Sequence, residues 1–407
     1  MKRAGVLLCC CVAACQGEPA RVTSTQIGDT ILVHSAAPRF ADTATFVRTR
    51  TWGRFDGPVE EEFVHIQAFA VSAAGDVYVF SRGVGLLRFD GHGRFVGKVA
   101  GVGQGPAEVG CAHHLAARGD TVAVLDPCNQ RLALFSPGQP PRSWRTSVSY
   151  PIRYGEDALY YDGDGALWMG FLPAIPQGGA VGFPRPAGAR FTADGSLQDT
   201  VFVPSRYAAR CPLLTEWQYF VGIWEDKREQ WFPKVKWALG PDGRVAFGCP
   251  NEFELDVLRP GRELLRISKP WQPARTSEDE RAFYEQWWQP LPTLPEHRPA
   301  YARIILPPDG RSWVWPEQPA EKFPYNEDSQ RITGRTYGWI AGESGAFEVF
   351  EPDGEWLGSV RLPENVHYSG YATTEPIVIR GDTMWAVYQD SLDVEYIGRF
   401  EIRWPNK

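Results

Sequence analysis

A turn made of Gly or Asp-Gly, followed by a short β-rich run, recurs six times along this chain. An apolar run also precedes each turn, so each copy indicates a β-hairpin with a tight turn. This repeat constrains the fold more than any other feature, because each copy must be one structural unit of a larger array. The six copies are AAGDVYVF from Ala73, ARGDTVAV from Ala117, DGDGALWM from Asp162, GPDGRVAF from Gly240, PPDGRSWV from Pro307 and IRGDTMWA from Ile379.

A second turn follows most of these hairpins, so the repeating unit has four antiparallel strands. Four-stranded antiparallel units arranged around an axis are the blades of a β-propeller. The second turn occurs only five times, because the chain ends soon after the sixth hairpin. Its copies are FDGHGRFVG from Phe89, FSPGQPPRSW from Phe135, FTADGSLQD from Phe191, LRPGRELL from Leu258 and FEPDGEWLG from Phe350.

A closed propeller must take the missing strand from the other end of the chain. The β-rich run TATFVRTRTW, residues 43–52, precedes the first unit and is predicted to be the outer strand of the last blade. Closing the ring in this way also removes exposed sheet edges. We therefore predict an all-β fold, a single six-bladed β-propeller over residues 43–407, with seven blades as the alternative. Trp168, Trp313 and Trp385 fall inside predicted strands, so we expect them in the core between blades.

The run VLDPCNQRLALFSPG, which begins at Val124, resembles an NHL repeat. The Asp-x-x-Asn-x-Arg pattern of that family and its following aromatic residue correspond to Asp126, Asn129, Arg131 and Phe135. The first unit departs from the pattern, with Ser81 and Arg82 where Asp and Asn are expected. The loop GVGQGPAEVG, from Gly101, resembles a segment of six-bladed propeller lipoproteins of environmental bacteria. The resemblance implies an architecture from about residue 66 onward, but no single activity.

The N-terminus, MKRAGVLLCCCVAAC, has the features of a bacterial lipoprotein leader. Two basic residues precede an apolar stretch of 11 residues, which suits a secretory signal and is too short to span a bilayer. Because VAAC resembles a lipobox, we predict a signal peptide over residues 1–14, a lipid on Cys15 and a tether over residues 15–42. Gln16 favours routing to the outer membrane of the cell envelope. The alternative is an ordinary signal peptide that leaves Cys15 unmodified.

The formal net charge of −7 comes without a basic stripe. An acidic chain of this kind disfavours nucleic acid as a partner and adhesion to anionic lipid by charge. We therefore expect no nucleic-acid partner, contact with the membrane only through the lipid anchor, and a monomer.

The long insertions all fall on one face of the predicted propeller. In a four-stranded meander, the first-to-second and third-to-fourth turns lie on one face, the turn face, and the other connections lie on the opposite face. The turns are uniformly short here, and the other connections contain insertions at residues 172–188, 204–232, 271–300 and 316–345. Long loops on a rigid scaffold are typical of a binding site, so we expect the ligand on this insertion face. The alternative is that long loops are merely tolerated there.

Four cysteines remain beyond the leader and Cys15. An even number in an exported chain favours two disulfides. In each of two blades, one cysteine precedes the first strand and another follows the second strand, both on the insertion face. We therefore predict the disulfides Cys111–Cys128 and Cys211–Cys249.

The insertion at residues 271–300 contains a predicted helix, TSEDERAFYEQWWQ, which opens with a capping box at Ser277 and Glu280. Its aromatic side chains at positions 283, 284, 287 and 288 share one face. We expect this stripe to pack on the propeller rim, and a lid over the central channel is the alternative. Tryptophans in the insertions are candidates for stacking on sugars or gripping a peptide. These are Trp217, Trp224, Trp287 and Trp288.

No nucleophile elbow, zinc-protease motif or phosphate-binding loop occurs, so no catalytic residue is predicted. His113 and His114 are neighbours on a predicted strand, so only one of them can line a central channel. Our main hypothesis is a binding protein for a peptide, glycan or partner protein, without a cofactor. Its other candidate ligand-binding residues are Arg82, Glu108, His113, Asp126 and Asn129. The alternative is a metal-dependent hydrolase, such as a lactonase, or a lyase, with a divalent cation on Glu108, Asp126 and Asn129.

Overall fold

The computed structural model describes residues 21–63, 65–145, 159–170, 186–202, 235–259, 261–287, 296–324, 331, 337–342, 345–363, 366, 377–392 and 394–405. Within these residues the protein is almost entirely β, and its helical elements include α3 (Glu278–Trp287) and the 3-10 turn η1 (Pro127–Asn129). No helix in the described part of the chain is long and apolar enough to cross a membrane.

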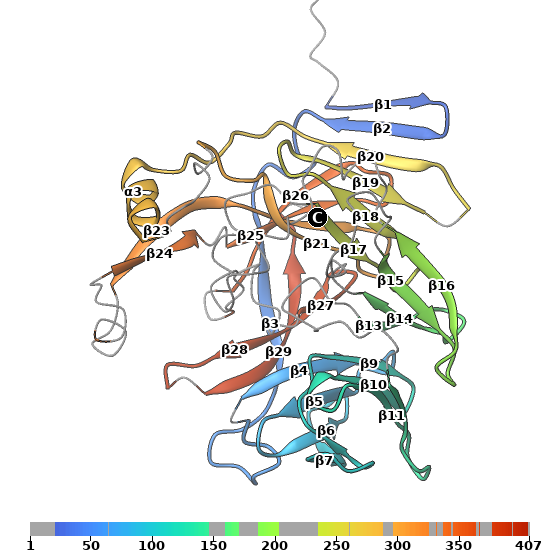
Figure 1. Cartoon of the computed structure of the whole chain (residues 1–407). Coiled ribbons are helices and arrows are strands. Elements are labelled where there is room, and N and C mark those ends of the chain that lie inside the picture. The colour runs from blue at the N-terminus through green and yellow to red at the C-terminus, as the bar shows by residue number, and fades with distance from the viewer. Residues whose placement is uncertain are drawn as a thin grey trace, which may run out of the picture.

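Six sets of strands follow the six hairpins of the sequence, and we number them units 1 to 6 in chain order (Figure 1). Units 1 to 3 are β4 (Ile66–Val71), β5 (Val77–Ser81), β6 (Gly85–Phe89) and β7 (Phe95–Val102); β9 (His114–Arg118), β10 (Thr121–Asp126), β11 (Arg131–Phe135) and β12 (Arg142–Arg145); and β13 (Leu159–Tyr161), β14 (Leu167–Gly170), β15 (Pro186–Phe191) and β16 (Leu197–Phe202). Units 4 to 6 are β17 (Lys236–Leu239), β18 (Val245–Gly248), β19 (Glu254–Leu258) and β20 (Leu264–Ser268); β21 (Tyr301–Ile305), β22 (Ser312–Pro316), β25 (Ala346–Phe350) and β26 (Trp356–Arg361); and β27 (Ile377–Arg380), β28 (Thr383–Gln389) and β29 (Glu395–Arg403).

The strand expected to complete the last unit is present as β3 (Ala44–Trp52). β3 pairs antiparallel with β29, from Trp52 opposite Ile397 to Thr45 opposite Arg403. At its start β3 also pairs in parallel with β26, so units 5 and 6 share one continuous sheet. The sheets are therefore mixed rather than purely antiparallel, and a second parallel pair joins β7 to β8 (Glu108–Val109).

The buried core lies between neighbouring units. Each of the six buried apolar clusters draws its residues from two consecutive units, and one of them joins unit 6 to unit 1. In that cluster Trp52 and Trp385 pack with Phe69 of unit 1. The prediction for the strand tryptophans is confirmed, because Trp168, Trp313 and Trp385 are all buried. In Figure 1 the first strands of the units lie toward the middle of the molecule, and the last strands β7, β16 and β20 lie farther out.

Arginine side chains join neighbouring units on the turn face. Arg380 of unit 6 donates hydrogen bonds to the carbonyls of Val71 and Ser72 in unit 1. The other contacts are Arg88 with Asp120 (unit 1 to unit 2), Arg244 with the carbonyl of Pro307 (unit 4 to unit 5) and Arg311 with Asp382 (unit 5 to unit 6). Hydrogen bonds with a charged donor are stronger than neutral ones, so these contacts stabilise four of the junctions between neighbouring units.

The N-terminal segment differs from the tether expected over residues 15–42. β1 (Val22–Ile27) and β2 (Thr30–Ser35) form an antiparallel hairpin, and β2 pairs in parallel with β20 of unit 4. Val33 is buried in the core between units 4 and 5. The physical reason is that β20 would otherwise present an unpaired sheet edge, and the hairpin covers it.

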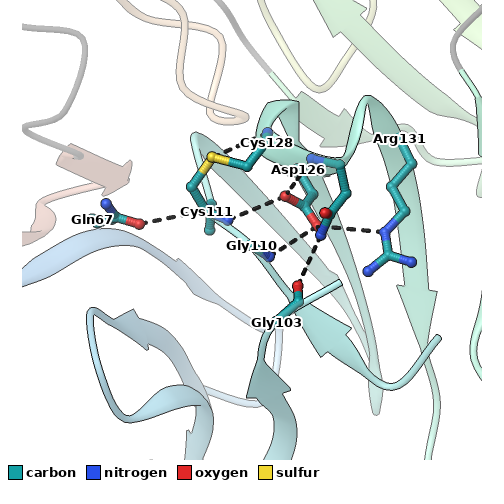
Figure 2. Close-up of a disulfide and its surroundings, with 9 residues drawn as sticks. Gln67, Gly103, Gly110, Cys111, Asp126, Cys128 and Arg131 are labelled. Atoms are coloured by element: carbon teal, nitrogen blue, oxygen red, sulfur yellow. Dashed lines mark hydrogen bonds and ion pairs between the residues drawn. A yellow bond between two sulfur atoms is a disulfide. The ribbon is translucent and has the colours of Figure 1, made fainter. Parts of the chain in front are cut away.

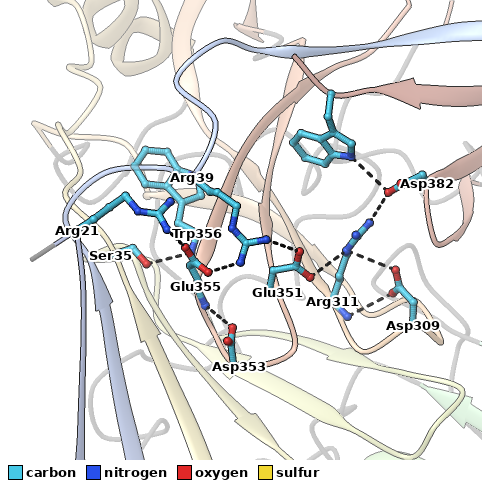
Figure 3. A network of polar contacts seen from close by, with 11 residues as sticks. Arg21, Ser35, Arg39, Asp309, Arg311, Glu351, Asp353, Glu355, Trp356 and Asp382 are labelled. Carbon is cyan, nitrogen blue, oxygen red and sulfur yellow. Dashed lines mark hydrogen bonds and ion pairs between the residues drawn. The ribbon is translucent and has the colours of Figure 1, made fainter. Parts of the chain in front are cut away.

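An ion-pair network holds the chain on both sides of this hairpin to the turn face of unit 5 (Figure 3). Arg21 and Arg39 both contact Glu355, and Arg39 also contacts Glu351 at 3.2 Å. Glu351 in turn pairs with Arg311, at 3.3 Å, so the network reaches the first turn of the same unit. Residues 21–40 are therefore part of the folded body.

Candidate functional site

Three of the candidate residues, Glu108, Asp126 and Asn129, meet at one corner of unit 2, where β10 ends on the insertion face (Figure 2). The predicted disulfide Cys111–Cys128 is confirmed, with Cα atoms 5.6 Å apart. Of the second predicted pair, Cys249 is disulfide-bonded, and Cys211 lies outside the described residues. The first disulfide closes the loop before β9 against the turn after β10.

Asp126 organises this corner as the N-cap of η1. Its fully buried carboxylate accepts hydrogen bonds from the backbone N–H groups of Gly110 (3.2 Å), Cys111 (3.1 Å) and Asn129 (3.3 Å). It also accepts from Asn129 Nδ2 at 2.6 Å and from Arg131 Nε at 3.4 Å. Five donors saturate one carboxylate, so Asp126 braces the backbone instead of facing a ligand.

Glu108 and Asn129 tie the glycine-rich loop to the same corner. Glu108 Oε2 accepts from the N–H of Gly105 at 2.8 Å, and Asn129 Nδ2 donates to the carbonyl of Gly103 at 2.9 Å. Gly103 has a φ of 152°, and a Cβ there would overlap the Glu108 carboxylate. The loop therefore needs glycine because the Glu108 side chain fills the space beside it.

These three side chains do not fit a divalent cation. Calcium and magnesium need several oxygen ligands that can turn toward the ion. The Asp126 carboxylate already faces N–H donors, and Asn129 presents its N–H₂ group to Asp126 and Gly103. Across the part of the chain that the structure describes, no group of three or more His, Cys, Asp or Glu side chains could hold a metal.

A cavity of about 470 Å³ lies beside the braced corner, between the end of η1 and the outer strand β12. This volume is within the usual range for small-ligand sites. The Trp144 Nε1 atom is buried without a hydrogen-bond partner among the described atoms. The cavity is lined by Gln104, Cys128, Asn129, Gln130, Arg131, Ser143, Trp144 and Arg145. Its lining is mostly polar, with two guanidinium groups.

The two neighbouring histidines stand at the first strand of unit 2. The backbone N–H of His113 donates to the carbonyl of Leu125 at 3.0 Å, and His114 is paired with Leu125 in the sheet. Burial lowers the pKa of His113, and it lowers the pKa of His114 to about 3, with the charges of His113 and Arg303 acting in the same direction. Both imidazoles are therefore neutral at pH 7.

The remaining candidates do not join this corner. Arg82 is exposed in the turn between β5 and β6, and it is not among the residues that line the cavity. Trp287 is the last residue of α3. Trp217, Trp224 and Trp288 lie outside the described residues.

The helix α3 has the predicted capping box. The N–H of Glu280 donates to Ser277 Oγ at 3.1 Å, and the N–H of Ser277 donates to Glu280 Oε2 at 3.2 Å. Glu280 is also buried against Arg298, in an ion pair with both side chains almost fully covered. Burial raises the pKa of Glu280, and the charge of Arg298 opposes that rise. With Phe283 buried as well, these contacts favour a helix packed on the propeller over a lid.

The cavity was not predicted from the sequence. Of its lining, Asn129 was a candidate residue, and the disulfide Cys128 was predicted, but Trp144 and Arg145 were not. The available signal was their position, because RSWR follows the second turn of unit 2 and had to form an outer strand next to the Asn-containing turn.

No protein-family model matches the sequence, and no curated protein is significantly similar to it. The structure is similar to a member of the DUF4221 family from Bacteroides vulgatus, with a TM-score of 0.55 and 10% identity over 89% of this chain and 99% of that one. Virginiamycin B lyase from Staphylococcus aureus (TM-score 0.39, 10% identity, 88% and 99% covered) and the PQQ-bound aldose sugar dehydrogenase of Streptomyces coelicolor (0.42, 13%, 90% and 100%) also match. At these identities the likeness shows the fold alone, an all-β fold of the propeller type.

Proposed function

We propose that this chain is an exported, lipid-anchored, six-bladed β-propeller that binds its ligand on the insertion face. Six units of strands, six cores shared by neighbouring units, and the return contact of Arg380 to unit 1 support a ring of six blades. The NHL-like pattern of unit 2 supports the same architecture. The lipobox ending at Cys15 supports an anchor in the bacterial cell envelope, with the outer membrane as the expected location.

The observation that carries the binding proposal is the cavity at the corner of unit 2. A disulfide and the five bonds to Asp126 hold its floor in place, which suits a site that is formed before the ligand arrives. Amide, hydroxyl, guanidinium and indole groups line it, and these pair well with the hydroxyl groups of a sugar. Among the classes expected from the sequence, we therefore favour a glycan, with a peptide as the other outcome of the test.

The test is a screen of the purified full chain against a glycan array and, in parallel, a displayed peptide library. Ser143→Trp should fill the cavity and lower the affinity of any selected ligand by about 10-fold or more. The indole would exclude several contacts worth about 0.5–1.5 kcal/mol each, and about 1.4 kcal/mol corresponds to a tenfold change in affinity. The matched control is Asp199→Trp, on the outer strand of the next unit, which should bind as the unaltered protein does. Equal affinity in the two variants would move the site away from this cavity.

The helical insertion can be tested with the same selected ligand. If α3 takes part in the site, replacing Trp287 and Trp288 with Ala should weaken capture while the unfolding curve stays unchanged. Unchanged capture would remove the helix from the site.

The anchor is tested by fractionation. Cys15→Ser should release the protein into the soluble fraction of a bacterial host, because the thioether-linked lipid has nowhere to attach. Continued membrane association of this variant would contradict the lipoprotein assignment.

The contacts of Glu108, Asp126 and Asn129 do not favour the metal-dependent hydrolase or lyase. Elemental analysis of the full chain, purified without chelators, is the direct check. A stoichiometric calcium, zinc or manganese ion would support the metal-dependent enzyme instead, and lactone and ester substrates would then be tested.

A further inference from the structure

The first strands of the units converge on the middle of the molecule (Figure 1). β9 of unit 2 lies in contact with β4 of unit 1 and with β13 of unit 3, and β17 of unit 4 lies in contact with β21 of unit 5. Side chains on these strands are the ones that can meet across the axis. Apolar residues would be expected there if the middle were only a core.

Three of these strands carry a basic side chain at the same place. This place is four positions before the start of the first turn of the unit. It is occupied by His114 in unit 2, Lys236 in unit 4 and Arg303 in unit 5. Their strands are otherwise mostly apolar, with the sequences HLAAR, KWAL and YARII. Lys236 is buried, and His114 and Arg303 are half-buried, so the position repeats but is not fully closed to solvent.

The charge of Arg303 acts on titratable side chains of two other units, which agrees with first strands that converge on the middle of the molecule. The charge of Arg303, on unit 5, lowers the pKa of His114, on unit 2. It also acts on Tyr160, on unit 3, where it opposes the rise in pKa that burial causes. Because the influence of a charge on a pKa falls off with distance, these effects support the placement around the middle of the molecule that the converging strands already give.

The group of side chains offers hydrogen-bond donors around a positive charge. The ordinary pKa of a tyrosine is 10.0 and burial raises that of Tyr160, so its hydroxyl is protonated at pH 7 and can donate. His114 is neutral, and its Nε2 atom is buried with no hydrogen-bond partner among the described atoms. A buried nitrogen of this kind is costly unless something binds it. Arg303 also has contacts within the protein, which hold it in place.

We propose that Arg303, His114 and Tyr160 form an oxyanion-binding site at the middle of the ring, which takes the carboxylate or phosphate group of a small ligand. A guanidinium presents a planar fork of donors that matches either oxyanion. A tyrosine hydroxyl and an imidazole N–H complete the set from two other units. The site is separate from the cavity of unit 2, so the outcome of either test leaves the other proposal standing.

The experiment is calorimetric titration of the full chain with inorganic phosphate and, separately, with succinate. Arg303→Gln should weaken binding of the preferred anion by about 10-fold or more, the usual effect of losing a charged hydrogen-bond donor. The matched control is Arg403→Gln, which alters an arginine of β29 whose side chain is 64% exposed and should bind as the unaltered protein does. Which of the two anions binds more tightly assigns the ligand to the phosphate or carboxylate class.

A second measurement does not depend on the Arg303 variant folding. In the unaltered protein labelled with ¹⁵N-histidine, the ring nitrogen signal of His114, identified by its loss in His114→Gln, should shift on addition of the bound anion. Absence of binding by both anions, equal affinity of Arg303→Gln and the unaltered protein, or an unmoved His114 signal at saturating anion would each overturn the proposal.

Discussion

Replacing Asp126 with Ala should be among the most destabilising single changes in unit 2. The substitution removes the acceptor of five hydrogen bonds from a carboxylate that has no exposed surface. Each buried donor left without a partner costs about 1–3 kcal/mol. The costs do not add fully, because water can reach the corner from the adjoining cavity, so we expect a total loss of about 3–5 kcal/mol.

The assay is urea unfolding followed by tryptophan fluorescence, with midpoints compared at equal slope. Asp164→Ala is the matched control, because that carboxylate is 88% exposed and makes one ion pair, with Arg190 at 3.1 Å. Such a pair contributes about 0–1 kcal/mol. Asp126→Asn keeps the size of the side chain but sets an N–H₂ group against N–H donors, so it should fall between the two. If Asp126→Ala unfolds within about 0.5 kcal/mol of Asp164→Ala, the brace is not what holds this corner.

Four further predictions address other parts of the fold. The double variant Cys111→Ser, Cys128→Ser lacks the disulfide that joins residues 17 positions apart, so its free energy of unfolding in denaturant should fall by about 3 kcal/mol. An unchanged midpoint would show that Asp126 alone fixes the corner. Arg380→Met removes the donor to two carbonyls of unit 1 and should cost about 1–3 kcal/mol in the same assay, and no change would argue against a stabilising link between units 6 and 1. Deleting residues 22–35 should expose the edge of β20 and produce oligomers in size-exclusion chromatography; a purely monomeric deletion variant would show that the edge needs no cover. The backbone N–H and side chain of Arg94, with the backbone N–H of His92, hold the pKa of Asp90 at about 2, below its ordinary value of 3.8. The ionised carboxylate therefore stabilises the fold above pH 3.8, and this stabilisation is lost as the pH falls toward 2. Asp90→Asn should flatten this part of a pH series of unfolding midpoints, and an unaltered profile would contradict the lowered pKa.

The repeat made the sheets predictable because it is written in residues that the backbone geometry demands. Glycine occupies the left-handed position of most first turns, for example Gly75 at φ 90° and Gly310 at φ 92°, and few other residues tolerate that conformation. The apolar runs on either side could then only be strands of a hairpin. The same layout placed Cys111 and Cys128 at neighbouring ends of one unit, which is why their pairing followed from the sequence.

The N-terminal hairpin was missed although its own sequence predicts one. VTSTQI and TILVHS flank Gly28-Asp29, a turn dipeptide between two β-rich runs. Its position between the lipobox and the first repeat favours a tether instead. What decides its structure is the free edge of β20, more than 200 residues later, and no local pattern reveals which edge is left uncovered.

The role of the Asp-Asn-Arg corner could not be decided from residue types. A carboxylate, an amide and a nearby Glu are equally suited to hold a cation or to accept backbone N–H groups. The discriminating feature is how many N–H donors the surrounding turns direct at the carboxylate. For Asp126 these donors come from η1 and from the loop at Gly110, which the sequence brings together only through the fold. The sequence shows side chains that could bind a cation, but it does not show which backbone N–H groups already donate hydrogen bonds to them.

The basic side chains on the first strands could have been predicted from the sequence, because their positions repeat from unit to unit. A basic residue inside one apolar strand is ambiguous, because it can lie at a strand end and reach solvent. When His114, Lys236 and Arg303 are counted from the first turn of their own units, the same offset of four recurs in three units. Because equivalent positions of equivalent strands lie at equivalent distances from a common axis, a repeated offset places the three side chains at one level around the middle of the ring. The repeated offset therefore places Lys236 near the proposed site of Arg303, His114 and Tyr160. We expect Lys236→Met to lower anion affinity as Arg303→Gln does in the same titration, and an unchanged affinity would place Lys236 outside the site.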